Sequence, residues 1–384
     1  MKAAWQSRQL GDVAEVIAGQ SPHGSFYNES GVGLPFYQGK KDFSDRYINA
    51  PTTWTTQVTK VARDGDVLMS VRAPVGPVNF ATEDCCIGRG LAAIRSQDGL
   101  DRNFLFYFLL SKEDEICGNA GAIFSSINRS DIQCIPIAVP DVSEQQRIVS
   151  VLDEAFEAIA TTRTNAEKNL RNVRALFESH LHAEFEQSRA GWVKMRLEQL
   201  GTTQTGSTPK TSDKRNFGGF IPFVKPADFK KDGSLDYDND GLSESGLLTA
   251  RRVRADSVLM VCIGTIGKCA YTDRDITTNQ QINSLTVQTG YDPRFIYYQM
   301  LTRDFQNRVR RSSSQTTIPI INKSKWSALT LCVPPTQEEQ ALIAGRLDAL
   351  ATETQRLESI YQRKLAALDE LKKSLLHRAF AGEL

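Results

Sequence analysis

The chain of 384 residues contains two copies of one sequence pattern, about 190 residues apart. CIPIAVPDVSEQQRIVSVLD (134–153) reappears as TLCVPPTQEEQALIAGRLD (330–348), and further pairs follow the same order along the chain. They are LPFYQGKKDF and IPFVKPADF (34–43, 221–229), GDVLMSVRAPVG and ADSVLMVCIGTIG (65–76, 255–267), DRNFLFYFLLS and DPRFIYYQMLT (101–111, 292–302), and SHLHAEF and SLLHRAF (179–185, 374–380). This period is too long for a solenoid unit, so it indicates the duplication of a whole module.

The front part of each module has the pattern of a small domain with many short strands. Residues 65–72 and 257–263 are apolar runs that end in glycine- or proline-bearing turns, which predicts buried strands. Asp101 and Asp292 stand before aromatic-rich stretches and predict helix N-caps, with Pro293 in the first turn. We interpret the aromatic side chains of these stretches as core rather than as base-stacking residues.

The back part of each module predicts a helix of about 35–40 residues, which would be about 50–60 Å long. Apolar or small residues recur in steps of three and four, as in a heptad stripe. They are Leu152, Phe156, Ile159, Ala166, Leu170, Val173 and Phe177 in the first copy, and Leu347, Leu350, Thr354, Leu357, Tyr361, Leu368, Leu371 and Leu375 in the second. Each stripe needs a partner, and the duplicated stripe is the obvious one.

The expected fold is therefore α+β: two homologous globular domains, each followed by a long α-helix. The two helices pair antiparallel as a coiled-coil spacer, with an internal pseudo-twofold relation. The expected boundaries are 1–142 for the first globular domain, 143–188 for the central helix, 189–336 for the second globular domain and 337–384 for the last helix.

Charge is unevenly distributed, although the whole chain carries a formal net charge of only +1. Residues 187–335 carry 21 basic and 13 acidic side chains, a net of +8, whereas residues 1–140 carry 13 and 15, a net of −2. The second module is therefore basic enough to bind a polyanionic partner, but the whole chain is not a generic binder of polyanions. No apolar run approaches a membrane span and the first residues lack a signal-peptide core, so we expect a cytoplasmic protein with reduced cysteines.

The sequence offers no catalytic constellation and no metal site. Among the four histidines, His180 and His182 lie two apart on a predicted helix and face different ways. CIGTIGKC (262–269) has the wrong glycine spacing for a phosphate loop. Two modules without chemistry, joined by long helices, favour the recognition of something bipartite.

These residues resemble the DNA-specificity subunit of Type I restriction-modification systems over essentially the whole chain. The motifs that carry the resemblance are VPDVSEQQRIVSVLD, VPPTQEEQALIAGRLD, LLHRAFAGEL, SVRAPVG with CIGRGLAAIR, and TGSTPKT with NFGGFIPFVKPADF. The resemblance implies two target-recognition domains that each read half of an interrupted double-stranded DNA site. It also implies two bound adenine methyltransferase subunits that use S-adenosylmethionine, and restriction subunits that use ATP and Mg²⁺, so that this chain itself binds no cofactor and is not an enzyme.

Polar loop residues are the predicted DNA contacts, because Gln and Asn suit adenine edges while Arg and Lys suit guanine or phosphate. In the first domain they are Gln20, Ser21, His23, Gln38, Lys40, Lys41, Arg72 and Arg89. In the second they are Ser207, Thr208, Lys210, Lys225, Thr265, Lys268, Gln280, Gln281, Ser314, Gln315 and Thr316, with Arg308, Arg310 and Arg311 as phosphate contacts. The predicted subunit contacts are Glu144, Gln145, Ile148, His182, Phe185, Glu339, Gln340, Ile343, His377 and Phe380.

Because the two domains differ in sequence, we expect different half-sites, about one turn of DNA or 34 Å apart. Three alternatives stay open at this stage. The chain could be a coiled-coil scaffold that binds proteins, a nuclease with an unrecognised site, or a non-catalytic scaffold and recognition subunit of another DNA-modifying phage-defence complex.

Overall fold

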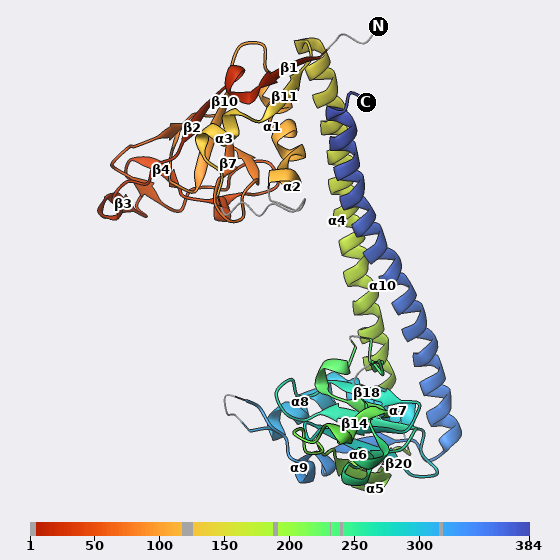
Figure 1. Cartoon of the computed structure of the whole chain (residues 1–384). Coiled ribbons are helices and arrows are strands. Elements are labelled where there is room, and N and C mark those ends of the chain that lie inside the picture. The colour runs from red at the N-terminus through yellow and green to blue at the C-terminus, as the bar shows by residue number, and fades with distance from the viewer. Residues whose placement is uncertain (1–4, 117–125, 187–190, 231, 239–240, 315–317) are drawn as a thin grey trace. The chain divides into compact units, whose positions relative to one another are not determined.

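The computed structural model describes residues 5–116, 126–186, 191–230, 232–238, 241–314 and 318–384. The chain divides into two compact units, residues 1–166 with 363–384 and residues 167–362. Each unit contains one globular domain and a segment of each long helix, α4 (Val142–Glu186) and α10 (Gln337–Phe380) (Figure 1). The predicted α+β class with two long helices is confirmed.

The first unit is built around a four-stranded antiparallel sheet with strand order β2-β10-β7-β8. A second sheet, in the order β3-β5-β4-β9-β6, and the pair β1-β11 complete the domain. The strands are β1 (Gln6–Gln9), β2 (Ala14–Ala18), β3 (Tyr27–Asn28), β4 (Leu34–Tyr37), β5 (Trp54–Thr55), β6 (Val61–Ala62), β7 (Val67–Ser70), β8 (Val78–Phe80), β9 (Cys85–Ile87), β10 (Leu91–Ser96) and β11 (Pro136–Val139). The helices are α1 (Arg102–Ser111), α2 (Glu113–Ile116) and α3 (Arg129–Gln133).

The second unit repeats this plan with the strand order β13-β20-β17-β18. Its smaller sheet, β15-β19-β16, and the pair β12-β21 take the places of the corresponding elements of the first unit. The strands are β12 (Val193–Arg196), β13 (Gly201–Thr205), β14 (Phe217–Ile221), β15 (Phe223–Val224), β16 (Arg252–Val253), β17 (Ser257–Val261), β18 (Cys269–Thr272), β19 (Ile276–Thr278), β20 (Ile282–Val287) and β21 (Thr330–Val333). The helices are α5 (Leu197–Leu200), α6 (Glu244–Thr249), α7 (Pro293–Leu301), α8 (Arg303–Ser312) and α9 (Lys323–Ser327).

Both faces of each central sheet are buried, which explains the continuous apolar runs in the sequence. Successive side chains of a strand point to opposite faces, so Val67 and Met69 join the core under α1 while Leu68 joins the core under the second sheet. Strand β17 divides its side chains in the same way, with Val258 and Met260 on one side and Leu259 on the other.

The predicted N-caps of α1 and α7 are confirmed. Asp101 Oδ1 accepts hydrogen bonds from the N–H groups of Asn103 and Phe104 (2.8 and 2.9 Å). Asp292 Oδ1 accepts from those of Arg294 and Phe295 (2.8 and 3.0 Å). The aromatic residues that follow are buried in the cores, so their interpretation as packing residues is also confirmed.

Each long helix contributes its two ends to different units. In unit 1 the first part of α4 lies beside the last part of α10, and in unit 2 the last part of α4 lies beside the first part of α10, so the helices run antiparallel within each unit (Figure 1). Ion pairs cross between them, as Arg163–Asp369 in unit 1 and Arg174–Glu358 (3.0 Å) in unit 2. The prediction that Leu371 belongs to the buried stripe is wrong, because its side chain is 47% exposed. None of the described helices is long and apolar enough to cross a membrane.

Three aromatic side chains, which we call the aromatic trio, pack together in each unit. One of them lies at the end of the long helix that belongs to the other copy of the repeat. In unit 1 Phe104 packs against Trp5 and against Phe380 at the end of α10 (ring centroids 6.4 and 5.2 Å apart). In unit 2 Phe295 packs against Trp192 and against Phe185 at the end of α4 (5.6 and 5.3 Å). The repeated SHLHAEF and SLLHRAF segments therefore each pack against the globular domain of the opposite module.

Candidate nucleic-acid interface

Four loops of the first domain meet at one edge of its central sheet. The backbone N–H of Gln20 donates to Ile87 O (2.9 Å), that of Gly88 donates to Tyr37 O (2.8 Å), and that of Val71 donates to Gly90 O (2.9 Å). The N–H of Arg89 donates to Ser21 Oγ (3.2 Å). These bonds bring together the predicted residues Gln20, Ser21, Gln38, Arg72 and Arg89, which come from four separate stretches of sequence.

The space between these loops is tight enough to require glycine. A Cβ on Gly90 would lie 2.2 Å from Gln38 O, and one on Gly19 would lie 2.2 Å from Gly88 O. His23 caps the short 3₁₀ turn η2 (Gly24–Phe26), which follows the first of these loops. Lys40 and Lys41 are exposed on the turn η3 (Lys40–Asp42), which follows Gln38.

The second domain assembles the matching loops with the same backbone bonds. The N–H of Ser207 donates to Thr278 O (2.9 Å), that of Asn279 donates to Val224 O (3.2 Å), and that of Cys262 donates to Gln281 O (2.7 Å). Thr208 Oγ1 donates to Gln280 Oε1 (2.6 Å). The predicted residues Ser207, Thr208, Gln280 and Gln281 therefore meet at one edge, and Lys225 directly follows Val224 in the adjoining loop.

The other predicted contacts of the second domain occupy its neighbouring turns. Thr265 and Lys268 lie in the β17–β18 turn, where the N–H of Gly264 donates to Pro319 O (3.1 Å). Ser314 begins the adjoining loop, and its N–H donates to Ile320 O (2.8 Å). Lys210 is exposed beyond Thr208. Gln315 and Thr316 lie outside the described residues.

The three arginines predicted as phosphate contacts have different surroundings on α8. Arg308 is held inside the unit, because its Nη1 donates to Thr330 O (2.6 Å) and to Thr330 Oγ1 (2.9 Å) while its Nη2 pairs with Asp304 (2.8 Å). We therefore assign Arg308 a structural role in place of the predicted phosphate contact. Arg310 and Arg311 are exposed in the last turn of the helix.

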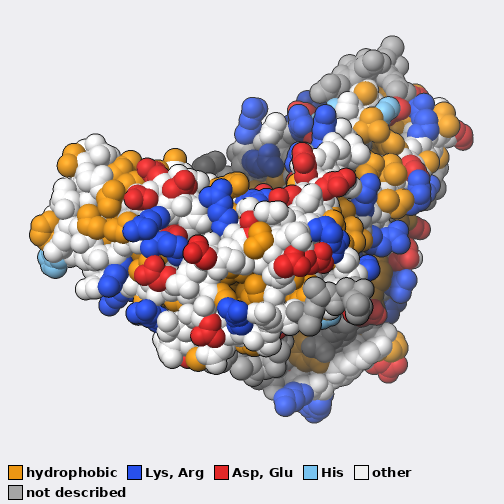
Figure 2. Space-filling model, turned by 90° about the horizontal axis from the view of Figure 1, so that it is seen from above, with side chains coloured by type: hydrophobic (Ala, Val, Ile, Leu, Met, Phe, Trp, Pro, Cys, Tyr) orange, Lys and Arg blue, Asp and Glu red, His pale blue; other side chains and the backbone are white. Residues whose placement is uncertain are grey.

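Arg251 is a basic residue at this edge that the sequence did not predict as a site residue. The N–H of Arg251 donates to Ser207 Oγ (3.1 Å), and its Nη1 donates to Thr205 O (2.8 Å), so this residue braces the first loop of the second domain. The cluster of arginines at positions 251, 252 and 254 is the sequence feature that could have indicated it. In Figure 2 basic and acidic side chains are interspersed over the visible face, so the charge of a domain is not a guide to its individual contacts.

A buried glutamine joins each domain to a long helix. Gln145 is completely buried; its Oε1 accepts from the Asp101 N–H (2.7 Å), and its Nε2 donates to Gly99 O (2.8 Å) and Pro140 O (2.9 Å). Gln340 accepts from the Asp292 N–H (2.8 Å) and donates to Pro334 O (3.3 Å). The repeated proline and Glu-Gln segment is thus the joint between the α1 or α7 N-cap and the first turn of the long helix.

This joint changes the role of several predicted subunit contacts. Gln145, Ile148, Gln340 and Ile343 are buried in their own units, so their side chains serve the internal packing instead of the surface. Phe185 and Phe380 belong to the aromatic trios. Glu339 is half-buried and accepts from Trp192 Nε1 (3.1 Å), while Glu144 pairs with Arg147 (2.6 Å). His182 is half-exposed and His377 is exposed.

A second joint links each domain to its helices through a tyrosine, an aspartate and an arginine. Tyr107 donates to Asp153 Oδ1 (2.5 Å) in unit 1, and Tyr298 donates to Asp348 Oδ1 (2.7 Å) in unit 2. Burial, and then the hydrogen bond to the carboxylate, raise the pKa of both tyrosines. The arginine differs in origin: Arg46 reaches Asp153 (2.6 Å) from a loop, whereas Arg294 reaches Asp348 (2.5 Å) from the first turn of α7.

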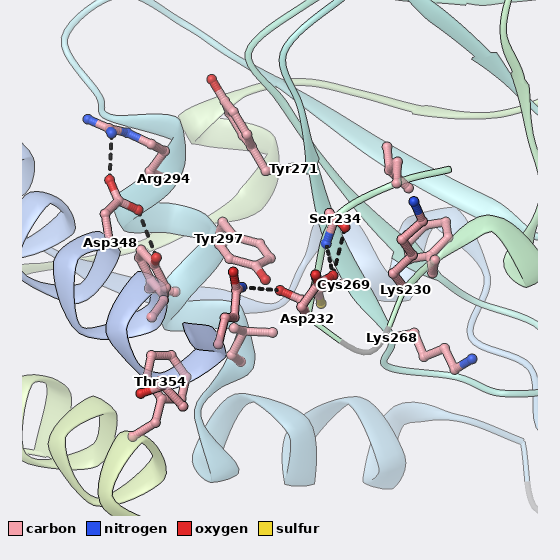
Figure 3. Close-up of a pocket in the computed structure, with 18 of the residues that line it drawn as sticks. Lys230, Asp232, Ser234, Lys268, Cys269, Tyr271, Arg294, Tyr297, Asp348 and Thr354 are labelled. Atoms are coloured by element: carbon pink, nitrogen blue, oxygen red, sulfur yellow. Dashed lines mark hydrogen bonds and ion pairs between the residues drawn. The ribbon is translucent and has the colours of Figure 1, made fainter. Parts of the chain in front are cut away.

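The arginine in unit 1 ties a loop that follows Lys40 and Lys41 to the helix α4. Burial lowers the pKa of Arg46, but the hydrogen bond to Asp153 and the charge interactions with Asp153, Tyr107 and Tyr47 together outweigh it, and the pKa is raised. Unit 2 has a cavity of about 1090 Å³ between its domain and the helices. Figure 3 shows Arg294 paired with Asp348 on one side of this cavity, and Lys230 and Lys268 on the other.

Comparison with known proteins decides which family these features belong to. A family model described as the Type I restriction modification DNA specificity domain matches residues 2–170 and again residues 189–364. The chain belongs to the family of Type I restriction-modification specificity subunits. Membership accounts for the two matching domains, and in this family the specificity subunit is the non-catalytic one.

Individual specificity subunits are similar over different shares of the chain. A putative MjaX specificity subunit from Methanocaldococcus jannaschii is 41% identical over 43% of this chain and 39% of its own length. The EcoDI specificity subunit of Escherichia coli is 22% identical over 99% of this chain and 88% of its own length. The first of these alignments thus spans well under half of the relative.

Solved structures support the fold. The HsdS subunit from Thermoanaerobacter tengcongensis matches with a TM-score of 0.61 at 18% identity, over 99% of this chain and 97% of that one. A chain from a structure of the assembly and conformational transition of the Type I R-M system matches with a TM-score of 0.82 at 19% identity, over 99% and 98%. At these identities the likeness concerns the fold alone.

Proposed function

We propose that this specificity subunit recognises an asymmetric, gapped double-stranded DNA site, with one half read by each domain. The observation that carries the proposal is the pair of loop edges, which share one backbone frame but present different side chains. A shared frame gives both domains the same way of presenting loops to DNA. Different side chains on that frame favour two different half-sites, so the site is not a palindrome.

The proposed DNA contacts are the exposed polar residues at these edges. Lys40, Lys41, Arg72 and Arg89 supply positive charge in the first domain, whose overall charge is slightly negative. Lys210, Lys225, Lys268, Arg310 and Arg311 do so in the second domain. Lysines and arginines at such an edge position the duplex through its phosphates, while base edges are read by shorter polar groups and by arginine.

The partners proposed for this chain are two copies of an adenine methyltransferase subunit, which hold S-adenosylmethionine, and restriction subunits, which use ATP and Mg²⁺. The exposed and half-exposed residues among the predicted contacts, Glu144, His182, Glu339 and His377, are the proposed places of contact. We further propose that α4 and α10, with 45 and 44 residues, set the length of the gap between the two half-sites.

Genome-wide mapping of methylated adenine tests this proposal. The chain is co-expressed with its cognate adenine methyltransferase in a host that lacks adenine methylation, and the methyltransferase alone is the control. The expected result is one gapped, asymmetric motif with one modified adenine in each half. A palindromic motif would contradict the asymmetry. No new methylation by an assembled complex that binds S-adenosylmethionine would overturn the proposed function.

Salt dependence provides an independent measurement on the purified complex. A protein that neutralises several phosphates loses affinity steeply as salt rises, because bound counterions are released on binding. We expect the logarithm of the affinity for the motif to fall linearly with the logarithm of the salt concentration. An affinity that does not change with salt would argue against phosphate contacts at the two edges.

A further inference from the structure

In each domain, the turn that leads into strand β10 or β20 of the central sheet has one exposed residue at its tip. In the first domain the turn is Gly88, Arg89 and Gly90, between β9 and β10. In the second it is Asn279, Gln280 and Gln281, between β19 and β20. Arg89 and Gln280 are the exposed middle residues, and we call them the turn-tip pair.

The turn-tip pair occupies equivalent positions in the two backbones. The N–H of Leu91 donates to Gly88 O (3.0 Å), and that of Ile282 donates to Asn279 O (3.2 Å). The N–H of Gly19 donates to Leu91 O (2.9 Å), and that of Gly206 donates to Ile282 O (3.0 Å). Two domains with little sequence in common at the tip therefore hold it in one conformation.

The residues that flank each tip are already engaged, although by different means. Gly88 and Gly90 have no side chains, and a Cβ on either would meet Ser21 Oγ at 2.9 Å or Gln38 O at 2.2 Å. Asn279 and Gln281 bond to each other, with Nδ2 to Oε1 at 2.9 Å and N–H to Oδ1 at 3.0 Å. In both turns the middle side chain is the one that extends outward.

The second domain orients its tip with a hydroxyl. Thr208 Oγ1 donates to Gln280 Oε1, so the amide plane is held while its Nε2 has no partner among the described residues. In the first domain Ser21 Oγ holds the backbone N–H of Arg89, and the guanidinium has no partner among the residues that the structure describes. Both tips therefore offer unused donors on a fixed support.

We propose that Arg89 and Gln280 are equivalent base-reading positions that give the two half-sites different sequences. This inference rests on the proposed DNA-recognition function and deepens it. A guanidinium pairs with O6 and N7 of guanine, while an amide pairs with N6 and N7 of adenine. The same place in the fold thus reads guanine in the half-site of the first domain and adenine in that of the second. Thr208 and Ser21 are positioning residues for these readers.

The test exchanges the two side chains within the intact methyltransferase complex. Arg89→Gln and Gln280→Arg are made separately, and each complex selects its preferred sequences from a pool of random gapped duplexes. Arg8→Gln, on β1, is the charge-matched control for the first variant. Gln288→Arg, just beyond the other end of β20, is the control for the second. Because neither tip side chain is buried, both variants are expected to assemble.

The expected result is a change or loss of base preference at one position in one half-site, by about tenfold or more, for each variant. The other half-site and the controls keep the wild-type preference. An unchanged motif with uniformly weaker binding would show that the pair contacts phosphate, and would overturn the inference while leaving the proposed function intact. Loss of preference in both halves from either single variant would also overturn it. Absence of any motif for the wild-type complex would refute the proposed function itself.

Discussion

Replacement of Gln145 by alanine is expected to destabilise unit 1 strongly, because three hydrogen bonds depend on its buried amide. The change leaves the N–H of Asp101 and the carbonyls of Gly99 and Pro140 without their partner. An unsatisfied buried polar group costs about 1–3 kcal/mol, and relaxation recovers part of that cost, so we expect a loss of about 3–5 kcal/mol. Unit 1 has about 190 residues, for which this loss lowers Tm by about 6–20 °C.

The equivalent change in unit 2 gives an internal comparison. Gln340 makes two hydrogen bonds, and the one to Pro334 O is long at 3.3 Å. Gln340→Ala is therefore expected to cost about 1–3 kcal/mol and to lower the Tm of unit 2 by less than Gln145→Ala lowers that of unit 1. Gln146→Ala is the matched control, because Gln146 is exposed in the same first turn of α4.

A carboxylate at position 145 adds a pH dependence. In Gln145→Glu one oxygen still accepts from the Asp101 N–H, but the other faces two carbonyl oxygens, and it can donate a hydrogen bond to one of them only when protonated. Burial and these carbonyls raise the pKa of the folded state above the unfolded value of about 4.3. The stability of the variant is then highest below about pH 4, although one carbonyl still lacks its donor, and it falls as the pH rises through the raised pKa, by up to about 1.4 kcal/mol per pH unit.

Calorimetry and hydrogen exchange are the measurements. Each unit has its own core, so the assay must separate their transitions, and exchange of peptides from α1 and the first turn of α4 assigns the loss to unit 1. Equal effects of Gln145→Ala and Gln146→Ala would refute the reasoning. So would a Gln145→Glu variant whose stability does not change between pH 4 and pH 7.

Three further predictions follow from the same contacts. Asp153→Asn should lower the stability of unit 1 by about 1–3 kcal/mol, because Arg46 is left half-buried without its carboxylate; calorimetry measures this, and Asp45→Asn on the exposed part of the same loop is the control. Cys134 and Cys332 should react quickly with a thiol reagent at pH 8, while Cys85 and Cys262 react only after denaturation, because burial raises the pKa of both buried thiols to about 12. Equal labelling rates in the native protein would contradict the burial. Asp141→Ala should weaken the first turn of α4 at neutral pH, because hydrogen bonds from Ser143 and Glu144 lower the pKa of Asp141. A lowered pKa stabilises the fold above the unfolded value of about 3.9, so the difference from wild type should vanish as the pH falls through the folded pKa in thermal melts between pH 2 and pH 7.

The sequence by itself determined the elements whose signals are local. The repeated blocks identify two modules, and the buried strands and helix caps follow from apolar runs and from aspartates before aromatic stretches. The heptad-like stripes predict two long helices. Each of these signals lies within one element, where periodicity and capping act over a few residues.

The sequence could predict which polar residues lie in the loops at these edges, but not how the loops are arranged in space. Polar residues in predicted loops indicated Gln20, Arg89, Ser207 and Gln280. Within each domain, the meeting of these loops depends on backbone bonds such as those from Gly19 to Leu91 and from Val71 to Gly90 in the first domain, which join distant parts of the sequence. No local pattern states which loop side chains are left free at a tip.

Only the tertiary structure decided which side chains form hydrogen bonds and ion pairs between a domain and a long helix. Gln145 has the appearance of a surface glutamine in the first turn of a helix, yet it is buried against Asp101, which precedes it by 44 residues. Arg46 and Arg294 supply the same charge to equivalent aspartates from unrelated positions. Such roles depend on long-range packing, because burial removes water and makes a partner far along the chain the only way to satisfy a polar group.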